Sequence, residues 1–148
     1  MVAERASGVE TTGLPVWHRS KQEVQVPLIL IGLGGFAGAI ARYLVDTEIT
    51  ARAAHAFPFG TLVVNLTGSF LLGLLVALTA ERGILPADMR GPVLVGFIGA
   101  YTTFSTFMLE SWRLVEIGAV GLAAVNLIGS VALGMAALVL GLAIGRLA

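Results

Sequence analysis

Four long apolar runs, separated by short polar segments, dominate the order of residues along the chain. They cover residues 27–45, 59–80, 92–109 and 119–147, and each comes close to or exceeds the roughly 20 residues that a transmembrane helix needs. The pattern predicts an all-α membrane protein with four transmembrane helices and with both chain ends on one side. Paired glycines at Gly34 and Gly38, and at Gly141 and Gly145, predict close contacts between helices.

Residues 1–25 are polar and lack the apolar stretch of about 7–15 residues that a signal peptide requires. We expect this segment to be a disordered tail on the cytoplasmic side. Residues 26–148 are then expected to form one four-helix transmembrane domain.

The composition supports a membrane protein and excludes several other classes of protein. The chain is 57% hydrophobic and 12% charged, about half the charged fraction of a typical soluble domain. The formal net charge is zero, so no basic surface suggests a nucleic-acid partner. The lack of cysteine excludes thiol chemistry and thiolate metal sites.

The basic residues near the ends of the apolar runs give only a weak preference for one orientation in the membrane. The side with the chain ends has Arg5, Arg19, Lys21, Arg82, Arg90 and Arg146, and the opposite side has Arg42, Arg52 and Arg113. A chain with so weak a bias can insert both ways. Dual insertion is the prerequisite for an antiparallel homodimer.

Polar and aromatic residues gather in three of the four predicted spans. The second span has Thr61, Asn65 and Ser69 at intervals of four, the fourth has Asn126 and Ser130, and the third has Thr102, Thr103, Phe104, Ser105, Thr106 and Phe107. Amides and hydroxyls donate hydrogen bonds, and the edge of a phenyl ring carries partial positive charge. Such a set suits a small, hard anion, whereas a cation path or proton relay normally carries a buried carboxylate.

Each of these residues also has an ordinary structural explanation. Serine and threonine in membrane helices often bond to their own backbone, a buried asparagine can join two helices, and a phenylalanine pair can be core packing. Arg42 can extend to the membrane surface, or it can form an electropositive vestibule that attracts anions.

The threonine- and serine-rich run of the third span is unfavourable for a regular helix. Its hydroxyls compete for backbone groups, and Gly96 and Gly99 just before it lower the helix propensity. We therefore expect the third helix to be broken within the membrane. The freed carbonyl groups would need an ion or another chain as partner.

Three motifs together resemble the small bacterial fluoride channels, called Fluc or CrcB. They are Gly35-x-x-Gly38-Ala-x-x-Arg42-Tyr43, Gly60-Thr-Leu-x-Val-Asn65-x-x-Gly68-x-Phe and Gly99-x-x-Thr-Thr-Phe-Ser-Thr-Phe107. The resemblance covers about 120 residues from Pro27 onward. It implies an antiparallel, dual-topology homodimer in the inner (plasma) membrane that passively exports fluoride and so relieves its toxicity in the cytoplasm.

The resemblance also implies roles for single residues. Asn65, Phe104 and Phe107 resemble the residues that meet the fluoride ion, and Thr61 and Thr103 lie on the same pathway. Ser130 resembles the hydroxyl of a polar track in the fourth helix, and Arg42 a vestibule arginine. Carbonyl groups of Gly99 and Thr102 resemble the ligands of a structural sodium ion at the dimer centre. The implied partners are therefore fluoride, sodium, membrane lipid and a second copy of the chain.

Two other functions are compatible with a four-span chain, and neither is an enzyme. A small multidrug exporter of the antiparallel-dimer type would need a membrane-embedded carboxylate, and the first span has none near its middle. A structural membrane protein would carry no ion flux. One departure from the family pattern concerns Asn126, where family members often have tyrosine, so the resemblance gives this residue no role.

Overall fold

The computed structural model describes residues 21–53 and 55–148, and no strand occurs in this part of the chain. The elements in chain order are α1 (Lys21–Ala53), α2 (Phe59–Arg82), α3 (Ala87–Arg90), the π-helical segment η3 (Gly91–Ile98), α4 (Gly99–Tyr101), α5 (Phe104–Glu116) and α6 (Val120–Leu147). Four segments are long and apolar enough to cross a membrane: Pro27–Ala53, Phe59–Arg82, Ala87–Glu116 and Val120–Leu147. These segments confirm the prediction of an all-α chain with four candidate spans. Residues 1–20 of the predicted tail lie outside the described residues, and residues 21–25 belong to the first turns of α1.

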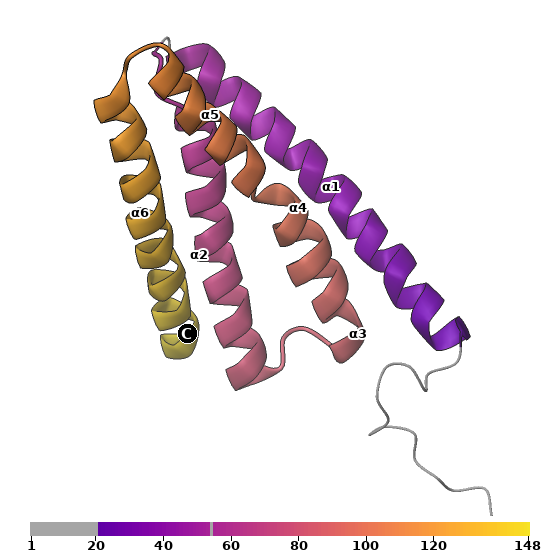
Figure 1. Cartoon of the computed structure of the whole chain (residues 1–148). Helices are drawn as coiled ribbons and strands as arrows, with labels where there is room; N and C mark the ends of the chain where they lie inside the picture. Colours follow the sequence, from indigo (N-terminus) through magenta and orange to yellow (C-terminus); the bar gives the residue numbers. More distant parts are fainter. Residues whose placement is uncertain (1–20, 54) are drawn as a thin grey trace, which may run out of the picture.

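The helices form two closely packed pairs. The most extensive contacts join α2 to α6 and α1 to η3, and Figure 1 shows α2 beside α6 while α1 runs along η3 and α4. The start of α1 and the end of α6 lie at the same end of the bundle. The third candidate span joins the two pairs, because its first half, η3 and α4, packs against α1 while α5 approaches α2 and α6.

Glycines allow the paired helices to approach closely. A Cβ atom added at Gly34 or Gly38 of α1 would overlap the carbonyl oxygens of Pro92 or Phe97 in η3. The second pair uses the same arrangement at Gly73, Gly141 and Gly145. These contacts confirm the close approaches predicted from the glycine pairs.

We expect Gly38→Ala to destabilise the protein by about 1–3 kcal/mol, because the added methyl group must displace the backbone of η3. Gly32→Ala is the matched control, since nothing lies within 4 Å of its Cβ position on the same helix. Thermal unfolding of both variants in detergent checks the difference. An equal unfolding temperature for the two variants would contradict the close contact.

Helices α1 and α5 extend past the ends of the predicted spans. The spans were expected to end at residues 45 and 109, whereas the helices continue to Ala53 and Glu116. Side-chain pairs one turn apart support these polar ends, namely the ion pair of Arg52 with Glu48 and the hydrogen bond from Trp112 to Glu116 at 2.9 Å. Hydropathy marked where the apolar segment stops, but the helix continues beyond it.

The backbone is extended at two residues between α4 and α5. Thr102 has ψ of 156°, and Thr103 has φ of −145° and ψ of 122°. The helical backbone conformation therefore ends after Tyr101 and resumes at Phe104. This interruption lies in the threonine-rich run that was expected to be unfavourable for a helix, and the candidate site is built around it.

Candidate functional site

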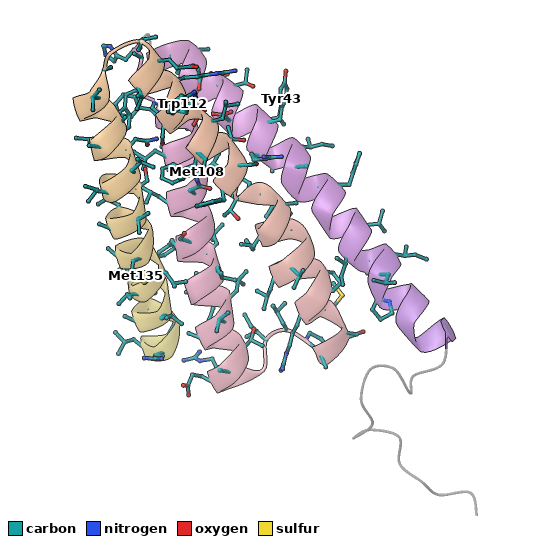
Figure 2. All side chains as sticks on the ribbon, in the orientation of Figure 1. Tyr43, Met108, Trp112 and Met135 are labelled. Atoms are coloured by element: carbon teal, nitrogen blue, oxygen red, sulfur yellow. The ribbon has the colours of Figure 1, made fainter. Side chains whose placement is uncertain are left out.

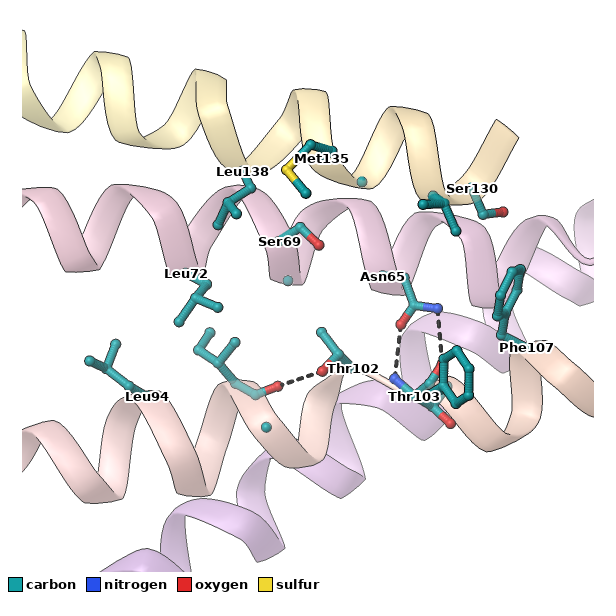
Figure 3. A pocket seen from close by; sticks show the side chains of 16 residues that line it. Asn65, Ser69, Leu72, Leu94, Thr102, Thr103, Phe107, Ser130, Met135 and Leu138 are labelled. Carbon is teal, nitrogen blue, oxygen red and sulfur yellow. Dashed lines mark hydrogen bonds between the residues drawn. The ribbon is translucent and has the colours of Figure 1, made fainter. Parts of the chain in front are cut away.

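Asn65 of α2 pairs with both backbone groups of Thr103. Its Nδ2 donates to the Thr103 carbonyl oxygen at 3.0 Å, and the Thr103 N–H donates to its Oδ1 at 2.8 Å (Figure 3). Interrupting a helix leaves backbone donors and acceptors unpaired, and these are costly to bury. One side-chain amide thus satisfies the donor and the acceptor of the residue at the interruption.

Thr103 also starts the next helix. Its Oγ1 accepts a hydrogen bond from the Thr106 N–H at 3.3 Å, as an N-cap residue does, and donates to Thr106 Oγ1 at 3.0 Å. Thr102 bonds instead to the preceding helical segment. Its N–H and its Oγ1 both donate to the Ile98 carbonyl, at 3.0 and 3.2 Å. The two neighbouring threonines therefore close one helix and open the next.

Because of these bonds, two carbonyl groups lack the N–H donors that they would have in a continuous helix. In a continuous helix the Gly99 carbonyl would accept from the Thr103 N–H, and the Thr102 carbonyl from the Thr106 N–H. The first donor is bonded to Asn65 instead, and the second to Thr103 Oγ1. Carbonyl oxygens are ligands that hard cations prefer. The residues at this point therefore fit the sodium ion that the family resemblance implies.

A cavity of about 420 Å³ lies between α2, α6 and the third span. Of the predicted site residues it brings together Asn65, Gly99, Thr102, Thr103, Phe104, Phe107 and Ser130, and it adds Ser69. Among the described residues that line it, none is charged. Figure 3 shows the polar and aromatic groups toward one end and Leu72, Leu94 and Leu138 toward the other.

The two phenylalanines of the site differ greatly in exposure. Their ring centroids are 6.1 Å apart, with the planes inclined by 54°. Phe107 is buried, with 5% of its surface exposed, whereas Phe104 is 72% exposed on the outside of the subunit. Phe107 is thus part of the packed interior, and Phe104 is free to meet a neighbouring molecule.

A smaller cavity of about 180 Å³ lies on the other side of Thr103, which lines both cavities. It contains two more predicted site residues, Arg42 and Thr61, together with Tyr43, Asp46 and Thr106. Thr61 is 3% exposed; its Oγ1 forms no well-aligned hydrogen bond among the described residues, but the carboxyl group of Glu110 lies next to it. Tyr43 projects away from the bundle in Figure 2. The smaller cavity therefore combines the guanidinium group of Arg42 and the carboxylate of Asp46 with a buried hydroxyl.

Sequence reasoning missed one polar residue, Ser111 of α5. Its hydroxyl donates to the Phe107 carbonyl at 2.7 Å and accepts from Asn126 Nδ2 at 2.9 Å. Asn126 Oδ1 in turn accepts from Ser130 Oγ at 3.0 Å. This Ser130–Asn126–Ser111 chain connects the larger cavity to the backbone of α5. A signal was present in the sequence, because Ser111 follows Phe107 by one helical turn.

Four candidate spans, three of which enclose an uncharged cavity that carries an amide and hydroxyl groups, define a multi-pass helical membrane protein with an interior site. The chain belongs to the CrcB family, because the family model described as "CrcB-like protein, Camphor Resistance (CrcB)" matches residues 29–142.

Curated relatives agree with this assignment. The "Fluoride-specific ion channel FluC" of Magnetococcus marinus is 48% identical over 117 residues, which cover 79% of this chain and 95% of the relative. The protein of the same name from Maridesulfovibrio salexigens is 45% identical over 119 residues, covering 80% and 94%. A third, from Methylococcus capsulatus, is 46% identical over 123 residues, which cover 83% of this chain but 54% of that longer relative.

Proposed function

We propose that this chain is a fluoride-selective ion channel and not an enzyme. The observation that carries the proposal is the larger cavity, where uncharged donors and phenyl rings meet without a carboxylate. The printed names of the relatives specify fluoride as their ion. Fluoride is a small, hard anion, so hydrogen-bond donors and ring edges can replace its water.

Each predicted residue then has a task along the pathway. Arg42 offsets the charge of Asp46 and attracts the anion into the smaller cavity, where the buried Thr61 hydroxyl turns from Glu110 to meet it. Asn65 keeps a second amide hydrogen, because only one is bonded to Thr103. Phe104, Phe107 and Ser130 continue the path in the larger cavity, and Thr103 borders both cavities.

The working channel in this proposal is an antiparallel homodimer with dual topology, whose third helix is broken within the membrane. The weak charge bias of the sequence allows both orientations. The exposure of Phe104 and of Gly99 in the single subunit supports a second copy that covers them. The same surface would otherwise present ring edges and a freed carbonyl group to lipid.

A structural sodium ion belongs to this proposal. The carbonyl groups of Gly99 and Thr102 would hold it at the centre of the dimer, because their helical donors are bonded elsewhere. When bound, the ion supplies positive charge to oxygens that have lost their hydrogen bonds. The proposed location is the inner (plasma) membrane, where passive export would lower cytoplasmic fluoride.

Fluoride efflux from liposomes tests the proposal. Purified protein is reconstituted into vesicles loaded with potassium fluoride, and a potassium ionophore starts the release that a fluoride electrode records. We expect rapid loss of fluoride and retention of chloride in parallel vesicles. Equal release of both ions, or of neither, would overturn the proposal, and proton-coupled uptake of a cationic dye would indicate a multidrug exporter instead.

A further inference from the structure

The Ser130–Asn126–Ser111 chain lies on the far side of the Ser130 hydroxyl from the larger cavity. Asn126 is 1% exposed and Ser111 is 3% exposed, and neither lines that cavity. Ser130 does line it, at the end where Phe107 lies in Figure 3. The buried asparagine therefore acts on the cavity only through its neighbours.

The donors and acceptors in this chain have one order. The Phe107 carbonyl can only accept, so the Ser111 hydroxyl hydrogen is committed to it. The Ser111 oxygen must then accept from the amide nitrogen of Asn126, Nδ2. The amide oxygen of Asn126, Oδ1, is left to accept the hydrogen of Ser130. The direction of every hydrogen bond follows from the backbone group at the end.

This order gives the Ser130 hydroxyl the wrong polarity for an anion. Its hydrogen points to Asn126, so the lone pairs of its oxygen are what remain for the cavity. To bind an anion, the hydroxyl must rotate and release the Asn126 oxygen. That oxygen is buried, and a buried acceptor without a donor is unfavourable.

Asn65 provides the contrast within the same cavity. Asn65 also bonds to the third span, but its amide nitrogen has two hydrogens and donates only one of them to Thr103. Asn65 can therefore donate to Thr103 and to an anion at the same time. Ser130 has a single hydrogen, which it can donate either to Asn126 or to an anion.

We propose that Asn126 is a positioning residue that turns the Ser130 hydroxyl away from the anion pathway and thereby weakens anion binding at this point. The inference rests on the proposed function and assigns a role to a residue on which the family resemblance is silent. A weakly binding step favours conduction, because an ion must leave each site as readily as it enters.

The decisive variant is Asn126→Leu, which removes both hydrogen bonds and keeps a similar volume. The Ser130 hydroxyl can then bond only weakly to the carbonyl of residue 126 one turn back, and an anion displaces that bond because hydrogen bonds to charged acceptors are stronger. We expect the fluoride concentration that gives half-maximal efflux to fall about tenfold. The maximal rate should fall as well, because release becomes slower. Structural damage alone would lower the maximal rate without lowering the half-maximal concentration.

Two further variants separate polarity from packing. Ser111→Ala removes the partner that orients the Asn126 amide but keeps the amide itself beside Ser130, so the half-maximal concentration should fall by less than in Asn126→Leu. In a Ser130→Ala background, Asn126→Leu should no longer shift it. If leucine prevents a monodisperse protein, Asn126→Ala removes the same two bonds with less bulk.

Several outcomes would overturn the inference. They are an unchanged half-maximal concentration in the Asn126 variants, an equal shift in Ser111→Ala, or an equal shift with and without Ser130. A wild-type protein that releases no fluoride would overturn the proposed function, and this inference with it. Fluoride release by wild type with any of the first three outcomes would overturn the inference alone.

Discussion

Asn65→Ala is expected to lower fluoride efflux by about a hundredfold while the subunits still assemble. The variant leaves the N–H and the carbonyl group of Thr103 without partners at the interruption. Each unpaired buried group costs about 1–3 kcal/mol, and about 1.4 kcal/mol corresponds to a factor of ten. The variant also removes the amide hydrogen that is available to the anion. The extended backbone at Thr103, which places Phe104 and Phe107, is therefore weakened together with a contact to the ion.

Liposome efflux measured beside a size-exclusion profile checks this prediction. Val76→Ala is a suitable control on the same helix, because Val76 is 40% exposed and lines neither site cavity. We expect the control to conduct within about twofold of wild type, since the truncation removes no hydrogen bond and little buried surface. Efflux at the wild-type rate from Asn65→Ala would count against a role for this amide in the pathway.

The number of spans could be predicted from the sequence because hydropathy is a local property. A run of about 20 apolar residues is readable without knowing what it packs against. The ends of the helices were harder, since α1 continues through Glu48 and Arg52 after the apolar run has ended. Those turns are held by pairs of charged side chains, which hydropathy counts only as polar.

The threonine-rich run also indicated where the backbone becomes extended, at Thr102 and Thr103, but not which side chain pairs with it there. Threonine and serine hydroxyls compete with a regular helix wherever they gather, and Thr102 and Thr103 do so here. That Asn65 would pair with both backbone groups of Thr103 depends on packing between residues 38 positions apart. Asn65 was expected to contact an ion, and the structure gives it a backbone partner as well.

Ser111 shows why a residue can be missed. A serine within a helix ordinarily bonds to the carbonyl one turn back, and Ser111 does so with Phe107. This local bond makes it look unremarkable in sequence. Its second bond, from Asn126, exists only because α5 packs against α6. The role of Asn126 follows from the same contact, so neither residue could be assigned before the helices were placed.

Phe104→Ile is expected to lower fluoride efflux by at least about tenfold without destabilising the subunit. Isoleucine keeps an apolar side chain but has no ring edge with partial positive charge, a difference worth about 1.4 kcal/mol or more in a dry site. The loss cannot be explained by the packing of one subunit, since Phe104 is 72% exposed there. Any effect on conduction must arise where Phe104 meets the ion or the second copy of the chain.

Two matched substitutions make the Phe104 result specific. Phe36→Ile replaces a ring of α1 that is 69% exposed and lines neither site cavity, so efflux should stay close to wild type. Phe107→Ile should lower efflux and also the unfolding temperature, because Phe107 is buried and its replacement leaves space in the interior. Efflux and thermal unfolding in detergent are measured for all three. If Phe104→Ile conducted like Phe36→Ile, the ring edge of Phe104 would have no part in binding fluoride, and the pathway would have to depend on Phe107, the amide and the hydroxyl groups.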